Sequence, residues 1–340
     1  MEENKKMKIL FDLNHPVDVN FFKNSILALK KNHHVSIIYR ERGKLEKILK
    51  FELKDVSIQK IGEHKKTFIG KVFFQLLRDL KIIRYIKKNK IDLVACFGST
   101  SAISTRLSGI SYLAFDDDFE YKIPFYHANW FCTKHIFPDF INFSNSKTRK
   151  YHGFKELAYL HPNYLRVSDK ILQEYNLLPD TYVFIREISS ISLNYKESTS
   201  VLDKLIEEIK KRGLKIILSL ENKSLSEVFI DDCILLEEPV SDIYSLLYNA
   251  LFTITSGDTV ARESAILGVP TIYTGMRKMA VNKVLVDEGL MIESSSVKDI
   301  LRYINTITNQ KKQETRSISR DLIKNKWEDT TSVILSHIQR

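Results

Sequence analysis

Short strand-like runs alternate with longer helix-like segments along most of this chain, and this alternation constrains its fold more than any other feature. The strand-like runs are apolar, β-branched or aromatic, and the segments between them repeat apolar residues at helical spacing. The runs are residues 8–12, 35–39, 93–97, 112–115, 182–185, 214–218, 234–236, 251–254 and 271–273. Such alternation predicts parallel sheets covered by helices on both faces.

The alternation starts again after His161 without an internal sequence repeat, and a chain of 340 residues exceeds the size at which one core keeps growing. We therefore predict an α/β protein with domains at residues 1–162 and 163–320, and a C-terminal helix within residues 321–340 that packs back on the first domain. Ligands of open parallel sheets bind beyond the carboxyl ends of the strands. The two sheets are thus expected to face each other across a cleft lined by those loops.

Composition indicates a cytoplasmic protein. The three cysteines, Cys96, Cys132 and Cys233, are widely spaced, which argues against a disulfide framework or a zinc site. No apolar run approaches the roughly 20 residues that cross a bilayer. The first residues lack the apolar core of a signal peptide.

The net charge of +10 is concentrated in the first half, where residues 1–160 hold 29 Lys and Arg against 17 Asp and Glu. Positive charge is densest at residues 60–90, interleaved with apolar side chains in a pattern typical of a helix. This stretch could dock on an anionic membrane surface through Lys65, Lys66 and Lys71, or it could be a core helix with solvated lysines. Nucleic acid is disfavoured as a partner, because no known binding motif accompanies the charge.

Residues 250–275 read as a strand, a tight turn, a short helix and a second strand. Small residues with free backbone N–H groups begin the helix, which makes a site for phosphate: Ser256, Gly257 and Thr259. Glu263 lies one turn further on the same face, where it can accept hydrogen bonds from a ribose diol. Asp258 would repel phosphate unless it caps the helix. The alternative is an ordinary α/β crossover with capped helix ends.

The expected loops of the first domain carry the other candidate residues. His15 suits general-base chemistry near neutral pH, although it could also be a turn histidine with no role. The acceptor or cleft residues are Asn14, Gly98, Ser99, Thr100, Asp116 and Glu120. The acidic run 116–120 could bind a divalent metal, supply a general acid and base, or form a solvated turn.

Five segments together resemble a known family: residues 12–24, 97–102, 115–118, 151–164 and 256–270. They are similar to an uncharacterised prokaryotic glycosyltransferase-like family of the GT-B superfamily. That superfamily includes the lipid II-forming N-acetylglucosaminyltransferase and the non-hydrolysing nucleotide-sugar 2-epimerases. The resemblance implies two Rossmann-like domains, with the acceptor in the first and the nucleotide-sugar in the second.

The resemblance also implies residue roles. Glu263 would grip the ribose, residues 256–259 the phosphates, Glu238 would lie beside the base, and Arg186 would follow the first strand of the second domain. The candidates for the catalytic base are His15, Asp18 and Asp117. Backbone amides and Arg186 would stabilise the leaving diphosphate, so neither a metal nor another cofactor is expected.

Three functions remain open. The first is a glycosyltransferase that moves a sugar to a glycan or lipid-linked acceptor, as in surface-polysaccharide synthesis, at the inner face of the cell membrane. The second is a nucleotide-sugar 2-epimerase that uses the carboxylates of residues 116–120. The third is a non-catalytic binding protein, since relatives carry histidines where this chain has Asp18 and Asn20. The basic stretch favours the transferase, because a soluble epimerase has no use for a membrane surface.

Overall fold

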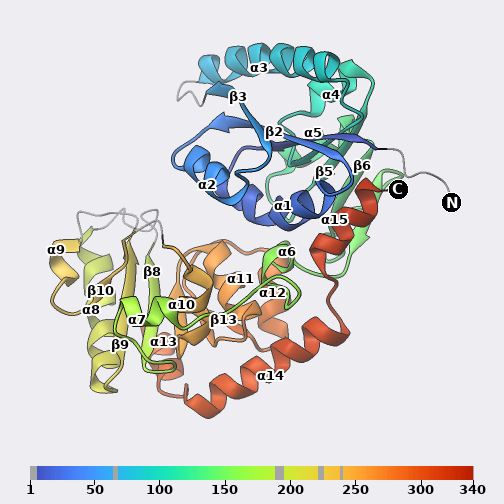
Figure 1. Cartoon of the computed structure of the whole chain (residues 1–340). Coiled ribbons are helices and arrows are strands. Elements are labelled where there is room, and N and C mark those ends of the chain that lie inside the picture. Colours follow the sequence, from blue (N-terminus) through green and yellow to red (C-terminus); the bar gives the residue numbers. More distant parts are fainter. Residues whose placement is uncertain (1–5, 64–67, 188–194, 221–225, 238–239, 340) are drawn as a thin grey trace. The chain divides into compact units, whose positions relative to one another are not determined.

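The computed structural model describes residues 6–63, 68–187, 195–220, 226–237 and 240–339. The chain divides into two compact units, Met1–His161 with Trp327–Arg340, and Pro162–Lys326. Each unit contains one sheet in which every strand pair is parallel. Helices flank both sheets (Figure 1), which confirms the predicted α/β class with two Rossmann-like domains.

The first sheet has the strand order β3-β2-β1-β4-β5-β6-β7. Its strands are β1 (Lys8–Leu13), β2 (His34–Glu41), β3 (Ser57–Glu63), β4 (Leu93–Phe97), β5 (Ser111–Phe115), β6 (Lys134–Pro138) and β7 (Thr148–Tyr151). The helices of this unit are α1 (Pro16–Leu29), α2 (Leu45–Glu52), α3 (Phe68–Asn89), α4 (Ala102–Ser108), α5 (Lys122–Phe131), α6 (Leu157–Leu160) and α15 (Thr330–Ile338).

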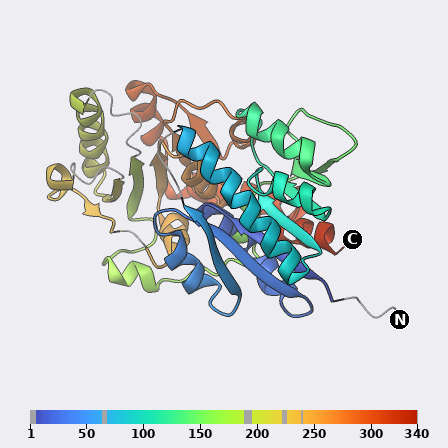
Figure 2. The ribbon, with the colours of Figure 1, turned by 90° about the horizontal axis from the view of Figure 1, so that it is seen from above.

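Successive side chains of a strand point to opposite faces of its sheet, so each strand supplies two cores. Leu10 of β1 packs in a cluster with Ile82 and Ile86 of α3. Its neighbour Phe11 instead meets Phe22 of α1, with ring centroids 5.1 Å apart. Helices α3, α4 and α5 therefore cover one face, and α1 the other; Figures 1 and 2 show α3 lying across the strands.

The second sheet has the strand order β10-β9-β8-β11-β12-β13. Its strands are β8 (Tyr182–Glu187), β9 (Lys215–Leu220), β10 (Ile234–Leu235), β11 (Phe252–Thr255), β12 (Thr271–Tyr273) and β13 (Met291–Glu293). The helices are α7 (Lys170–Glu174), α8 (Tyr195–Lys211), α9 (Ser226–Phe229), α10 (Ile243–Asn249), α11 (Asp258–Ile266), α12 (Ala280–Asp287), α13 (Val297–Ile304) and α14 (Asn309–Asn325).

Two segments differ from their predicted form. Residues 57–63 are the edge strand β3, so Lys60 belongs to a strand, and the basic helix α3 begins only at Phe68. The single C-terminal helix expected within residues 321–340 is instead the end of α14 followed by α15. The break occurs because Trp327 is buried against Phe154, with ring centroids 4.7 Å apart, and Asp329 then caps α15. None of the helices described is long and apolar enough to cross a membrane.

Candidate functional site

Both sheets reverse their strand order at one point, between β1 and β4 in the first and between β8 and β11 in the second. In open α/β sheets, ligands bind beyond the carboxyl ends of the strands at this reversal. The first reversal places Asn14 beside Thr100, with Nδ2 of Asn14 2.9 Å from Oγ1 of Thr100, and His15 follows Asn14 in the chain. The second places Arg186, at the end of β8, beside Ser256, which follows β11.

A buried ion pair lies at the first reversal of strand order. Asp12, fully buried at the end of β1, accepts hydrogen bonds from Arg78 of α3 at 2.5 and 3.1 Å. Thr100 donates to the same carboxylate at 2.9 Å, and Ser101 donates as well. Burial raises the pKa of Asp12, but the charge of Arg78 and these hydrogen bonds outweigh burial and hold the pKa below its ordinary value. Asp12 is therefore a fixed negative charge beneath the site.

Asn14 lies above this pair with one hydrogen-bonding atom unused. Its side-chain Nδ2 donates to Asp12 Oδ1 at 3.1 Å and to Thr100 Oγ1 at 2.9 Å. Its Oδ1 is buried, and no donor in the described part of the chain reaches it. A buried acceptor without a donor is costly, so this oxygen is suited to a ligand hydroxyl or N–H group.

His15 and Asp18 form a capping box at the start of α1. The His15 Nδ1 accepts from Val17 N at 3.3 Å, so in this cap the neutral ring carries its proton on Nε2, which is a hydrogen-bond donor. Asp18 Oδ2 accepts from the backbone N–H groups of Asn14, at 2.7 Å, and His15, at 3.0 Å. Burial lowers the pKa of His15, and the charges of Arg42 and Lys155 lower it further.

The pKa of Asp18 changes in the other direction. Burial raises it to about 7, because the two backbone N–H groups that stabilise the carboxylate form do not compensate for the lost solvation. Asp18 thus titrates in the range of a general acid or base. Its Oδ2, however, is already occupied by the helix cap.

The acidic run 116–118 does not form one cluster, because its three carboxylates face different partners. Asp116 accepts from His135 Nε2 at 2.8 Å, and Asp117 pairs with Lys155. Asp118 accepts from the backbone N–H of Glu120 at 2.7 Å. No group of three or more His, Cys, Asp or Glu residues that could hold a metal ion occurs among the described residues.

The β4–α4 turn depends on glycine. Gly98 has a φ of +83°, a backbone conformation that residues other than glycine rarely adopt. The space where a Cβ would lie is open. Its carbonyl accepts from Tyr112 Oη at 2.7 Å. This turn holds Ser99 and Thr100 at the carboxyl edge of the sheet.

The second reversal leaves a helix N-terminus open. The N-cap of α11 is Gly257, which has no side chain to cap the helix, and no side-chain cap hydrogen bond occurs there within the described part of the chain. The N–H groups of the first turn lack intrahelical acceptors, and the helix dipole adds positive potential, so this end favours an anion. Ser256 is buried before it, and Glu263, also buried, lies one turn further along.

Asp258 does not cap α11, which corrects one of the roles considered from the sequence. It is the first helical residue, and its carboxylate accepts from Tyr273 Oη and from Arg277 Nη1, the latter at 2.6 Å. This pairing offsets the negative charge beside the open helix end. Arg186 Nη1 donates to Ser219 Oγ at 2.8 Å. Glu238 lies outside the described residues.

The basic surface can be described only in part. Lys65 and Lys66 lie outside the described residues, as does the side chain of Lys71. The described part of α3 exposes four large apolar side chains: Phe74, Leu76, Leu77 and Leu80. Beside them, a hollow of about 470 Å³ between α3 and β3 is lined by four cations, Lys60, Lys81, Arg84 and Lys88.

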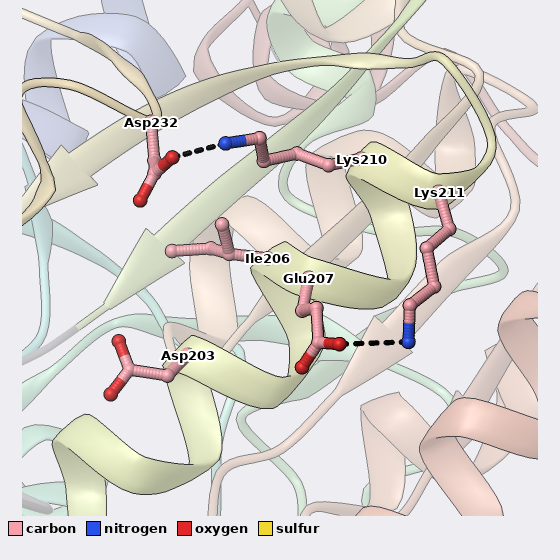
Figure 3. Close-up of a pocket in the computed structure, with 6 residues that line it drawn as sticks. All are labelled: Asp203, Ile206, Glu207, Lys210, Lys211 and Asp232. Carbon is pink, nitrogen blue, oxygen red and sulfur yellow. Dashed lines mark hydrogen bonds and ion pairs between the residues drawn. The ribbon is translucent and has the colours of Figure 1, made fainter.

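A second hollow, of about 310 Å³, lies beside α8 (Figure 3). Four of its five charged side chains form pairs, Lys210 with Asp232 and Lys211 with Glu207 at 2.8 Å, and the fifth is Asp203. Because both lysines are already paired, the hollow has little electrostatic attraction for an anion. We assign it no function.

The sequence profile of the family described as Protein of unknown function (DUF354) matches residues 138–338, more than half of the chain. The chain belongs to this family. A relative, the uncharacterized protein MJ0665 of Methanocaldococcus jannaschii, is 28% identical over 143 residues. The alignment covers 42% of this chain and 42% of that protein, so the match spans less than half the length of this relative.

Solved structures with a similar fold cover nearly the whole chain. The Staphylococcus aureus MnaA–UDP co-structure has a TM-score of 0.72 at 12% identity, covering 98% of this chain and 96% of that one. The UDP-GlcNAc 2-epimerase of M. jannaschii scores 0.70 at 17% identity, covering 98% and 99%. MurG of Acinetobacter baumannii scores 0.63 at 17%, also covering 98% and 99%. At these identities the likeness shows the GT-B fold.

Proposed function

We propose that this protein is a glycosyltransferase that moves a sugar from a uridine diphosphate sugar to an acceptor hydroxyl. The observation that carries the proposal is the open N-terminus of α11 at the strand reversal, with buried Glu263 one turn further. The helix end suits a diphosphate, and the carboxylate suits a ribose diol. The similar S. aureus MnaA structure contains UDP, and a structure of the M. jannaschii epimerase contains UDP-GlcNAc and UDP, which supports the nucleotide class.

The leaving diphosphate would be stabilised by the amides of α11 and by Arg186, without a metal. The Asp258–Arg277 pair reduces the repulsion that a free carboxylate would exert there. We expect transfer to continue in excess EDTA. Loss of activity in EDTA, with recovery on adding manganese or magnesium, would contradict this part of the proposal.

His15 is the best-placed general base of the three candidates. Its Nε2 becomes basic when the ring gives up a single cap hydrogen bond, from Val17 N to Nδ1, and carries its proton on Nδ1, whereas Asp18 Oδ2 holds two backbone N–H groups and Asp117 is paired with Lys155. Asn14 Oδ1 offers a hydrogen-bond acceptor nearby for the acceptor substrate. In this assignment His15→Ala lowers turnover by about 100- to 10,000-fold and changes donor affinity little.

The 2-epimerase alternative has one observation in its favour. The UDP-GlcNAc 2-epimerase of M. jannaschii has a TM-score of 0.70, against 0.63 for MurG. An epimerase needs groups that remove and return a proton at the second carbon of the sugar. The separate pairing of Asp116 and Asp117 argues against the acidic run in that role.

Incubation with UDP-GlcNAc alone, followed by proton and phosphorus NMR, separates the two activities. An epimerase converts UDP-GlcNAc to its C2 epimer without an acceptor. A transferase binds the donor and releases UDP at a useful rate only with an acceptor, tested with short-chain polyprenyl-phosphate glycans. Epimer formation without UDP release would reject the transferase assignment.

The donor site itself is tested by Glu263→Gln. Loss of the charge-assisted hydrogen bonds should weaken UDP binding by about 1.5–3 kcal/mol in calorimetry. The matched control is Glu314→Gln, at an exposed carboxylate on α14 in the same unit. Equal affinity of Glu263→Gln and the wild type would place the nucleotide elsewhere.

A further inference from the structure

Two hydrogen-bond acceptors at the carboxyl edge of the first sheet meet no donor in the part of the chain that the structure describes. One is Asn14 Oδ1, which is buried. The other is Asp116 Oδ1, because His135 Nε2 reaches Oδ2 of this carboxylate, at 2.8 Å. The Asp116 side chain is 16% exposed. A ligand that satisfies both oxygens must bring its own hydrogen-bond donors.

The two acceptors flank an open position of the sheet edge. One row of register partners crosses β1, β4 and β5: Asp12, Cys96 and Ala114. The residues that directly follow these strands lie two positions beyond the row: Asn14, Gly98 and Asp116. Neighbouring strands lie about 4.8 Å apart, so Asn14 and Asp116 are roughly 10 Å apart along the edge, with Gly98 between them. Apart from its chain neighbours, no described residue comes within 4 Å of the position that a Gly98 Cβ would take.

A chain of side-chain amides fixes the protonation of the His135 ring. Asn145 Oδ1 accepts from the backbone N–H groups of Lys147 and Thr148, at 3.0 and 3.2 Å. The Nδ2 group of Asn145 is therefore the donor to Asn129 Oδ1, at 2.6 Å. Asn129 then turns its own Nδ2 donor to His135 Nδ1, at 3.2 Å. The Nδ1 atom must accept this bond, so the ring carries its proton on Nε2.

The surroundings of His135 hold the ring in this orientation. The ring is fully buried, with centroids 4.5 Å from that of Phe125 and 5.0 Å from that of Phe137. Its Nε2–H group is thus directed at Asp116 Oδ2. The other oxygen of Asp116 is left as an acceptor for a ligand.

We propose that His135 is a positioning residue that fixes Asp116 as a hydrogen-bond acceptor, and that Asp116 and Asn14 accept two hydroxyl groups of a sugar that lies across Gly98. A phosphate group would bring no donor and would be repelled by the carboxylate, so the occupant is the hydroxyl-rich part of a ligand. That this sugar belongs to the acceptor substrate rests on the proposed transfer function, whereas the polarity of the subsite does not.

The tautomer of His135 tests the positioning role without any ligand. In long-range proton–nitrogen NMR spectra, the ring should carry its proton on Nε2 and none on Nδ1 between pH 6 and pH 8. The ring signals are assigned through the side-chain carbons to the His135 backbone. A proton on Nδ1 in this range overturns the proposal, because it would face the Asn129 donor.

Sugar binding is measured at pH 8. Burial raises the pKa of Asp116 against the opposing hydrogen bond from His135, and the carboxylate is the accepting form. The probes are the methyl glycosides of glucose, galactose, mannose and N-acetylglucosamine, and decyl phosphate as an anion with an apolar chain. At least one glycoside should shift the backbone NMR signals of Asn14, Gly98 and Asp116. No response to any glycoside, or a response to decyl phosphate at these residues, overturns the proposal.

Asp116→Asn keeps the shape of the side chain and changes its polarity. The His135 Nε2–H group must take the amide oxygen, so the NH₂ group faces the sugar and the affinity should fall about 10- to 100-fold. In a His135→Phe background the amide is free to turn its oxygen to the sugar, so Asp116→Asn should cost several-fold less there. The control Asp55→Asn, at an exposed aspartate of the same unit, should leave the affinity unchanged.

Unchanged affinity in Asp116→Asn overturns the binding role, and equal losses in the two backgrounds overturn the positioning role. If His135→Phe fails to fold, the tautomer measurement decides the positioning role. Glycoside binding with these variant effects, but without transfer by the wild type, means that the inference stands and the proposed function fails. Transfer with an acceptor KM that Asp116→Asn leaves unchanged means that the function stands and the inference fails.

Discussion

Asp12 and Asp18 are both buried at the edge of the first sheet, yet their pKa values shift in opposite directions. Asp12 faces the guanidinium of Arg78, which outweighs the cost of burial. Asp18 accepts from two backbone N–H groups, which do not outweigh that cost. The charge that each carboxylate faces, rather than its depth, decides its protonation state.

The raised pKa of Asp18 predicts a pH dependence of stability. Between the ordinary aspartate pKa near 4 and about 7, folded Asp18 holds a proton that the unfolded chain has lost. Unfolding therefore releases a proton, and the stability contributed by this group falls as the pH rises through 7. Asp18→Asn keeps an oxygen for the cap but cannot titrate.

Urea unfolding at pH 5 and pH 8 measures this effect. The free energy of unfolding of Asp18→Asn minus that of the wild type should increase as the pH rises from 5 towards 7. The increase should be up to about 1.4 kcal/mol per pH unit. The comparison variant is Asp55→Asn, at an exposed aspartate of the same unit. A stability difference that does not change with pH would contradict the shifted pKa.

At the scale of elements, α11 ends at a glycine that α14 packs against. Gly268 has a φ of +74°, and a Cβ there would lie 2.6 Å from the Cα of Arg316. Gly213 has a similar φ of +69° with nothing within 4 Å of its Cβ position. Gly213→Ala should cost only the strain of the left-handed conformation, about 1–2 kcal/mol.

Gly268→Ala should cost that strain and an additional 1–3 kcal/mol, roughly, because the backbone of α14 must move. Denaturant unfolding of the two variants gives the difference directly. Equal stabilities would mean that α14 is not packed tightly on the end of α11.

From the exposed apolar residues of α3 and the neighbouring cations, we predict that the protein docks on an anionic membrane surface through this helix. Each Lys or Arg near an anionic surface contributes about 1 kcal/mol. Reversing Lys81, Arg84 and Lys88 to Glu should therefore release the protein from vesicles that contain anionic lipid and spare UDP binding. Reversing Lys65, Lys66 and Lys71 should act in the same way.

The matched control reverses three exposed cations of the other unit, Lys298, Arg302 and Lys324, for an identical change in net charge. Vesicle sedimentation at low and high salt distinguishes the variants. Equal release by both triple variants would indicate a net-charge effect, and no sedimentation of the wild type would leave α3 as a solvated surface.

For the whole molecule, the last residues complete the first unit. Thr330 and Thr331 donate to the carbonyls of Phe154 and Ala158 at 2.7 and 2.8 Å, and Ile334 is fully buried. Truncation after Lys326 should therefore destabilise the first unit by several kcal/mol, about the cost of removing large buried side chains.

Hydrogen exchange followed by mass spectrometry checks this prediction. Protection should fall in α1 and α6, which α15 contacts, and persist in β8 and β11 of the second unit. Protection lost equally in both units would mean that they unfold together.

The sequence by itself determined the alternation of elements, the boundaries of strands such as β4 and β12, and the turn of small residues between β11 and α11. These are local properties, set by periodicity and by small residues at a helix start. Edge strands such as β3 were missed, because charged residues interrupt their apolar pattern.

Only the tertiary structure decided which charges meet. Arg78 reaches Asp12 across 66 positions of the chain, and Lys155 reaches Asp117 across 38. Neither contact is encoded in a local sequence pattern, because parallel strands bring loops that are distant in the sequence to the same edge of a sheet. Arg78 among the apolar residues of α3 and the lysine of the 151–164 segment were visible in the sequence, but the sequence did not indicate which carboxylates they would meet.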